Sequence, residues 1–119
     1  MSKPLRFLIL DGYPKASRDQ FDEVGMKLAW ALYRDMLVKY LPDAEYDVWL
    51  SSDDLKGGAT EEDLKGYAGV LWPGCNLTVY HTDDERATCQ VELAKRAYNV
   101  GVPGFGSCWG AQVAVYSAG

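Results

Sequence analysis

Phe7-Leu8-Ile9-Leu10, followed by Asp11-Gly12, is a short run of apolar residues that ends at a polar residue and a glycine. An apolar run without polar alternation is typical of a strand that is buried on both faces of a parallel sheet. Three more segments suit strands, and they are residues 46–50, 70–72 and 103–107. Because helix-compatible stretches separate these segments, the sequence predicts an α/β fold with a parallel sheet and right-handed crossovers.

The stretch between the first two strands predicts one amphipathic helix. Ser17 with Gln20 matches a capping box, and Asp19 is an equal candidate for the N-cap. Pro42 is expected to end this helix, because proline cannot continue it. Apolar residues recur at helical spacing and are expected to face the core: Phe21, Val24, Leu28, Leu32, Met36 and Leu37.

Two further helices are expected before the last strand. Residues 60–64 suit the start of a short helix. In the second, Thr82 with Glu85 forms a capping box, and Gly101 is expected to stop the helix. The residues expected to form its buried face are Ala87, Val91, Ala94 and Tyr98.

The composition limits the class of protein. The chain has 119 residues, 48% hydrophobic and 24% charged, which is ordinary for one soluble globular domain. A net charge of −5 without a basic stripe argues against a nucleic-acid partner. No apolar stretch is long enough to span a bilayer, and residues 1–4 do not lead into a signal peptide. Three cysteines without paired spacing suggest a reducing compartment, so a cytoplasmic location is expected.

Gly106-Ser107-Cys108-Trp109-Gly110 has the pattern of a nucleophile elbow, a sharp turn between a strand and a helix. Side chains two residues before and after the nucleophile would collide with nearby backbone, which favours glycine at both positions. The turn is expected to raise Cys108 above the sheet, at the start of a helix over residues 111–118. The N–H groups and dipole of that helix would favour the thiolate over the thiol.

The segment Cys108-Trp109-Gly110-Ala111-Gln112, with Val102-Pro103 and Gly106 before it, resembles the nucleophile motif of class I glutamine amidotransferases, in particular the GMP-synthase-like members. Residues 69–75 are similar to the strand and loop that supply part of the oxyanion hole in that family. The resemblance is strong over residues 102–115 and weaker over residues 69–80.

The resemblance implies a flavodoxin-like three-layer sandwich with strand order 2-1-3-4. It implies that Cys108 attacks the side-chain amide of glutamine, forms a thioester and releases ammonia. The backbone N–H groups of Gly74 and Trp109 would form the oxyanion hole. Gln112 and Gly110 would contact the substrate. No cofactor and no metal are expected, because the charge of a helix N-terminus accounts for the acidic pair Asp83-Asp84.

The other cysteines and the single histidine have simpler explanations. Cys89 is expected to be a packing residue within a helix, and Cys75 borders the expected site without a chemical role. His81 is expected to be an exposed loop residue, because the corresponding loop of the family does not carry the catalytic histidine. A short distance between His81 and Cys108 would overturn that expectation.

In the resembled family, the catalytic His and Glu lie well downstream of the nucleophile, and this sequence stops at Gly119, before they could appear. Three hypotheses account for this. Residues 1–119 are the N-terminal part of a longer amidotransferase domain, a degenerate relative that binds without catalysis, or a chain that completes its site with a synthase partner or with a second copy. A fourth alternative is a related cysteine hydrolase that acts on γ-glutamyl compounds.

Overall fold

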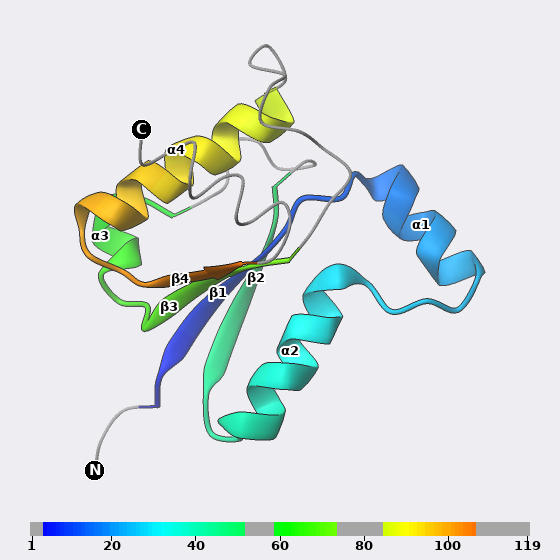
Figure 1. Ribbon diagram of the computed structural model, residues 1–119, viewed down its shortest axis with the longest axis horizontal. Helices are drawn as coiled ribbons and strands as arrows, with labels where there is room; N and C mark the ends of the chain where they lie inside the picture. The colour runs from blue at the N-terminus through cyan, green and yellow to red at the C-terminus, as the bar shows by residue number, and fades with distance from the viewer. Residues whose placement is uncertain (1–3, 52–58, 74–84, 107–119) are drawn as a thin grey trace.

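Four parallel strands form the centre of the computed structural model, which describes residues 4–51, 59–73 and 85–106 (Figure 1). These strands are β1 (Arg6–Asp11), β2 (Glu45–Leu50), β3 (Gly69–Trp72) and β4 (Gly104–Gly106). They pair in the order β2-β1-β3-β4, and each pairing is parallel. The α/β prediction with strand order 2-1-3-4 is therefore confirmed, and the arrangement is that of a flavodoxin-like sandwich.

Helices cover both faces of the sheet (Figure 1). On one face lie α3 (Glu61–Leu64) and α4 (Glu85–Asn99), and on the other lies α2 (Ala29–Tyr40). The main core cluster lies between the sheet and α4, and its buried members are Leu8, Leu10, Trp49, Ala59, Leu64, Val70, Trp72, Val91, Leu93, Ala94 and Ala97. Ile9, whose side chain alternates with those of Leu8 and Leu10, is also fully buried. Burial of both faces of β1 confirms the expectation from its apolar run.

The single helix expected between the first two strands is in fact two helices. Helix α1 spans Lys15–Glu23 and α2 begins only at Ala29. Gly25 lies between them with φ +74, a left-handed conformation that glycine adopts without strain and that ends a helix. The proposed capping box is also wrong, because α1 starts after Pro14 with no side-chain cap, and the backbone N–H of Ser17 donates to Pro14 O.

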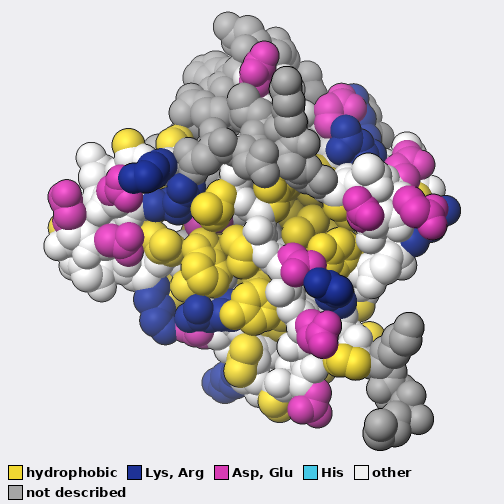
Figure 2. All heavy atoms as spheres, turned by 180° about the vertical axis from the view of Figure 1, so that it is seen from behind, with side chains coloured by type: hydrophobic (Ala, Val, Ile, Leu, Met, Phe, Trp, Pro, Cys, Tyr) yellow, Lys and Arg dark blue, Asp and Glu magenta, His cyan; other side chains and the backbone are white. Residues whose placement is uncertain are grey.

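The helix break changes which side chains face the core. Leu37 is 6% exposed, but Leu32 on the same helix is 54% exposed, and Val24 and Met36 are exposed as well. The apolar stripe expected to be buried is therefore largely on the surface, and the prediction was wrong for these residues. Figure 2 shows hydrophobic side chains gathered near the middle of the face seen there, with charged side chains around them.

The two later helices match the sequence more closely. Thr60 and Asp63 form a capping box at the start of α3. In α4, Val91 and Ala94 are buried as expected, whereas Tyr98 is 76% exposed, so its assignment to the buried face was wrong. Gly101 has φ +75 and follows the end of the helix, as predicted. The expected cap at Thr82 and the side chain of Ala87 lie outside the described residues.

Among the helices that the structure describes, none is both long enough and apolar enough to cross a membrane.

Candidate functional site

The carboxyl ends of the described strands meet at one edge of the sheet. Strands β1 and β3 are neighbours in the sheet. After β1 the chain continues to β2, which lies beside β1 at one end of the strand order, and after β3 it continues to β4 at the other end. This place is the topological switch point of the sheet. In open α/β sheets, ligands bind in the crevice outside the carboxyl ends of the strands at such a point. We therefore take this edge as the candidate site.

Asp11, the last residue of β1, is fully buried at this edge. Its Oδ1 accepts a hydrogen bond of 3.0 Å from the backbone N–H of Tyr13. Its Oδ2 accepts a longer one, 3.4 Å, from the backbone N–H of Trp30 at the start of α2. A buried carboxylate is costly unless it is hydrogen-bonded, so these donors explain how the charge is accommodated. Asp11 thereby connects the end of β1 to both the following turn and α2.

Arg18, on α1, also contacts this turn. Its Nη1 donates a hydrogen bond of 2.8 Å to the backbone O of Tyr13, and the residue is only 9% exposed. The ring of Tyr13 packs edge-on against Phe21, with ring centroids 5.1 Å apart. The N–H, the C=O and the side chain of Tyr13 are thus all engaged, and the turn after β1 is well fixed.

Ser51 fixes the end of β2 in a similar way. It is fully buried, and its backbone N–H donates to Asp11 O across 3.2 Å. The thiol of Cys89 lies 3.7 Å from Ser51 O, which brings α4 close to this strand end. Cys89 is half-buried and packs against the core cluster, as the sequence suggested.

Trp72, the last residue of β3, contributes a buried donor. The residue is 5% exposed, and no acceptor contacts its Nε1. Its ring lies over Gly104 of β4, where a Cβ would stand 3.4 Å from Cζ3 and 3.7 Å from Cε3.

The residues expected to carry out the chemistry lie outside the described part of the chain. These are Cys108, Gly74, Trp109, Gly110 and Gln112, and the same holds for Cys75, His81 and the expected helix over residues 111–118. The strands that lead to two of them are described. Trp72 pairs with Gly106 in adjacent parallel strands, and Gly74 and Cys108 each follow two residues later in the sequence.

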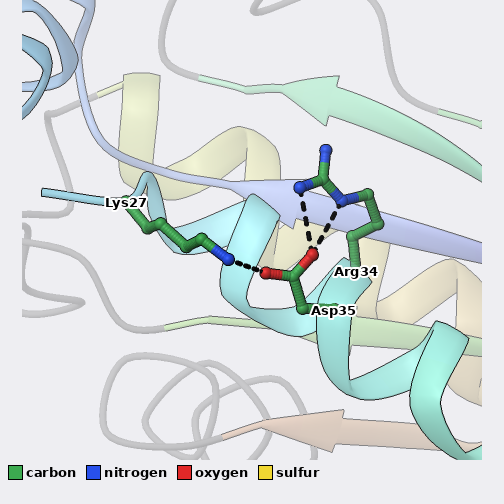
Figure 3. A network of polar contacts seen from close by, with 3 residues as sticks. All are labelled: Lys27, Arg34 and Asp35. Atoms are coloured by element: carbon green, nitrogen blue, oxygen red, sulfur yellow. Dashed lines mark hydrogen bonds and ion pairs between the residues drawn. The ribbon is translucent and has the colours of Figure 1, made fainter.

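The groups with shifted pKa values belong to other parts of the described structure. In one network, shown in Figure 3, Asp35 of α2 lies between Lys27 and Arg34. Hydrogen bonds from Lys27 and then from Arg34 lower the pKa of the Asp35 carboxyl. In the other, Arg6, Asp47 and Tyr67 connect the strands toward their amino ends. Both networks are partly exposed, so we assign them to stability rather than to the site.

Sequence patterns indicated that Asp11 ends a strand, but they did not indicate that Arg18 is buried beside the turn after that strand. A basic residue early in an amphipathic helix normally lies on the solvated face, and only the fold shows that this one is buried. Within the described ranges, no group of three or more His, Cys, Asp or Glu side chains could hold a metal ion.

Over 115 residues, the chain is 31% identical to γ-glutamyl-L-1-hydroxyisopropylamide hydrolase from Pseudomonas sp.. The alignment covers 97% of this chain and 38% of the hydrolase, so the chain spans less than half the length of that relative. No protein-family model matches the chain, and no solved structure matches it.

Proposed function

We propose that this chain carries the nucleophile of an enzyme that hydrolyses γ-glutamyl amides and belongs to the class I glutamine amidotransferase-like proteins. The observation that supports this most is the 31% identity with a γ-glutamyl amide hydrolase, which extends over nearly the whole chain. The parallel sheet supports it further, because its switch point is where this architecture binds ligands.

In the proposed reaction, the thiolate of Cys108 attacks the side-chain carbonyl carbon of the γ-glutamyl group. The carbonyl π electrons move to the oxygen, and the backbone N–H groups of Gly74 and Trp109 stabilise the resulting oxyanion. Collapse breaks the C–N bond, and a general acid, the role that the histidine fills in the resembled family, returns to the leaving amine the proton that the Cys108 thiol lost. The γ-glutamyl thioester that remains is then hydrolysed by water to glutamate and free thiol. Gln112 and Gly110 are proposed to contact the substrate.

The register of the sheet fits this division of roles. Trp72 and Gly106 are paired at the ends of neighbouring strands. Gly74 and Cys108 both come two residues beyond that pair in the sequence, which supports their proposed roles as oxyanion donor and nucleophile at the same edge of the sheet. The proposed substrate is a γ-glutamyl amide. Its leaving group is an alkylamine, or ammonia in glutamine, which is the smallest γ-glutamyl amide.

The test is covalent capture, which requires a reactive thiolate beside a γ-glutamyl site but does not require turnover. We expect a diazoketone analogue of glutamine to alkylate Cys108 and to leave Cys75 and Cys89 unmodified, as determined by peptide mass spectrometry. Excess γ-glutamyl alkylamide should slow this labelling. The Cys108→Ser variant should not be labelled.

Other results would point elsewhere. Equal labelling of the three cysteines, or labelling that γ-glutamyl alkylamide does not slow, would contradict the proposal. A non-catalytic binding module predicts instead that the chain binds a ligand with the same affinity before and after Cys108→Ser. Protection by glutamine but not by γ-glutamyl alkylamides would favour an ammonia-supplying amidotransferase domain with a synthase partner.

A further inference from the structure

Strand β2 stands at one end of the strand order, with β1 as its neighbour in the sheet (Figure 1). Its register with β1 continues without a bulge from Glu45 to Leu50. The N–H of Glu45 donates to Leu5 O, and the N–H of Ser51, just after the strand, donates to Asp11 O. Because the backbone groups of a strand point alternately to its two sides, the residues between these two that are even in number point away from β1.

The outer side of β2 therefore presents the backbone N–H and C=O groups of Tyr46, Val48 and Leu50. Within the described part of the chain, these groups have no hydrogen-bond partner. Such an edge is a template for a further strand, and proteins usually protect it with proline, lysine or a bulge. The sequence of β2, EYDVWL, contains neither proline nor lysine. Helix α2 packs against β1, which lies on the inner side of β2, so the outer side is left for a partner strand.

This edge is complementary to itself. If two copies of β2 pair antiparallel about a twofold axis at Val48, this residue lies opposite Val48 of the second copy, and Tyr46 lies opposite Leu50. Each opposite pair of this kind exchanges two backbone hydrogen bonds, so all the outward groups of both strands gain partners. The side chains of these residues share one face of the strand, where aromatic–aliphatic and aliphatic pairs across strands are favourable. Tyr46 is 37% exposed and is therefore available for such a pair.

The acidic residues of β2 favour the same register. Glu45 and Asp47 project from the other face of the strand, and with the axis at Val48 neither lies opposite an acidic residue of the second copy. The charge of Asp47 is also paired with Arg6, at 3.0 Å. An axis at Asp47 would instead bring the two copies of this carboxylate face to face, which is unfavourable. The charge pattern thus selects the axis at Val48.

We propose that two copies of this chain form a twofold dimer through the outer edges of their β2 strands, which joins the two sheets into one. The inference does not depend on the proposed function, because the carboxyl edge of the sheet takes no part in the pairing. In an antiparallel pairing the carboxyl edges of the two sheets point in opposite directions, so each copy keeps its candidate site open. Since strands of six residues bury less than the standard interface of about 800 Å² per partner, we expect the dimer to form at micromolar to millimolar concentrations.

The first experiment is sedimentation equilibrium of the full chain between about 1 μM and about 1 mM. We expect a monomer–dimer equilibrium whose dissociation constant falls as salt is added, because each copy carries a net charge of −5 and salt screens their repulsion. Val48→Pro removes the outward N–H on the axis and leaves the N–H groups that donate to β1 in place. It should raise the dissociation constant about 10-fold or more. Leu32→Lys, at an exposed apolar residue of α2, is the control and should leave it unchanged.

The second experiment tests the register by disulfide cross-linking. In Val48→Cys, the introduced cysteines of the two copies lie opposite each other, with Cα atoms about 5.5 Å apart, which suits a disulfide. In the matched control, Tyr46→Cys, the introduced cysteines lie four residues apart along the paired strands, about 13 Å, which is out of reach. With oxidised glutathione, we expect the link between introduced cysteines to form about 10-fold faster or more in Val48→Cys. Peptide mass spectrometry distinguishes this link from those of the three native cysteines.

Several results would overturn the dimer. One is a chain that stays monomeric up to about 1 mM, and another is a dimer that Val48→Pro leaves intact. A dimer weakened by Leu32→Lys alone would assign the association to the exposed face of α2 instead. If Val48→Pro does not fold, the cross-linking decides, because equal rates in Val48→Cys and Tyr46→Cys overturn the proposal and a faster rate in Val48→Cys supports it.

Discussion

The phenolic hydroxyl of Tyr67 donates a hydrogen bond of 2.6 Å to Oδ2 of Asp47. The same carboxylate accepts two hydrogen bonds from the guanidinium of Arg6, at 3.0 and 3.1 Å. Arg6 begins β1, Asp47 lies on β2, and Tyr67 comes just before β3. This network therefore connects three strands of the sheet toward their amino ends, opposite the edge that carries the candidate site.

The first prediction concerns this hydroxyl. Tyr67→Phe removes the hydrogen bond to Asp47 and leaves the ring in place, so we expect the free energy of unfolding to fall by about 1 kcal/mol. Urea denaturation at neutral pH measures the change. Tyr98→Phe, at a ring that is exposed on α4, should leave the stability unchanged. Equal effects of the two substitutions would show that the Tyr67 hydroxyl contributes nothing specific.

Alkaline pH should weaken the fold through the same residue. Burial, and then the hydrogen bond to Asp47, raise the pKa of Tyr67 from 10.0 to about 12. The folded chain thus keeps a proton that the unfolded chain loses, and the stabilisation present below pH 10 is lost as the pH rises toward about 12. Denaturation curves across this range should show a steeper loss of stability for the unsubstituted chain than for Tyr67→Phe. Parallel pH profiles would contradict the assignment.

Gly25 is predicted to be essential for the break between α1 and α2. Its φ of +74 is unfavourable for other residues, although an added Cβ would meet nothing within 4 Å. Gly25→Ala should therefore cost about 1 kcal/mol through backbone strain alone. Gly66→Ala is the control, because its Cβ would make only an ordinary contact of 3.4 Å with Asp63 O. A loss of stability at Gly66 as large as that at Gly25 would contradict this account.

The two faces of α2 give a prediction that tests the corrected helix orientation. Leu37 is buried and Leu32 is exposed on the same helix. Leu37→Ala should lower the free energy of unfolding by about 2–5 kcal/mol, the usual range for a truncated core leucine. Leu32→Ala should change it by about 0.5 kcal/mol or less. If Leu32→Ala destabilises the chain more than Leu37→Ala does, the result would support the helix orientation that the sequence pattern suggested.

The strands could be predicted from the sequence because short apolar runs are followed by turn residues, as in Leu8, Ile9 and Leu10 before Asp11. Strand β2, which contains Glu45 and Asp47, shows alternation instead of an apolar run. The helices after β1 could not be predicted in this way. Apolar residues at helical spacing continue across Gly25, so periodicity alone joined two helices that a left-handed glycine separates. A pattern of apolar spacing also does not say which side of a helix packs, and tertiary contacts decided that for Leu32 and Leu37.

The site was predictable only in part, for a related reason. Cys108 and its flanking glycines are adjacent in sequence, so a local motif identifies them as a hypothesis. Arg18 and Asp11 meet through the backbone of Tyr13, and that relationship arises from the turn after β1 rather than from a motif. A contact made through backbone hydrogen bonds does not require particular residue types at a fixed spacing, so a single sequence does not predict it.

Asp11 gives the last prediction. Its buried carboxylate accepts hydrogen bonds from the backbone N–H groups of Tyr13 and Trp30. Asp11→Asn keeps the size but puts an NH₂ group where one oxygen was, so a donor would face a donor at one of these positions. We expect a loss of about 1–3 kcal/mol, the range for an unsatisfied buried polar group. Hydrogen exchange should also accelerate at the Trp30 amide. The control is Asp19→Asn, at an exposed carboxylate paired with Lys15, and it should change little. If both variants are equally stable, Asp11 does not hold the carboxyl edge of β1, and the anchoring of Arg18 must come from elsewhere.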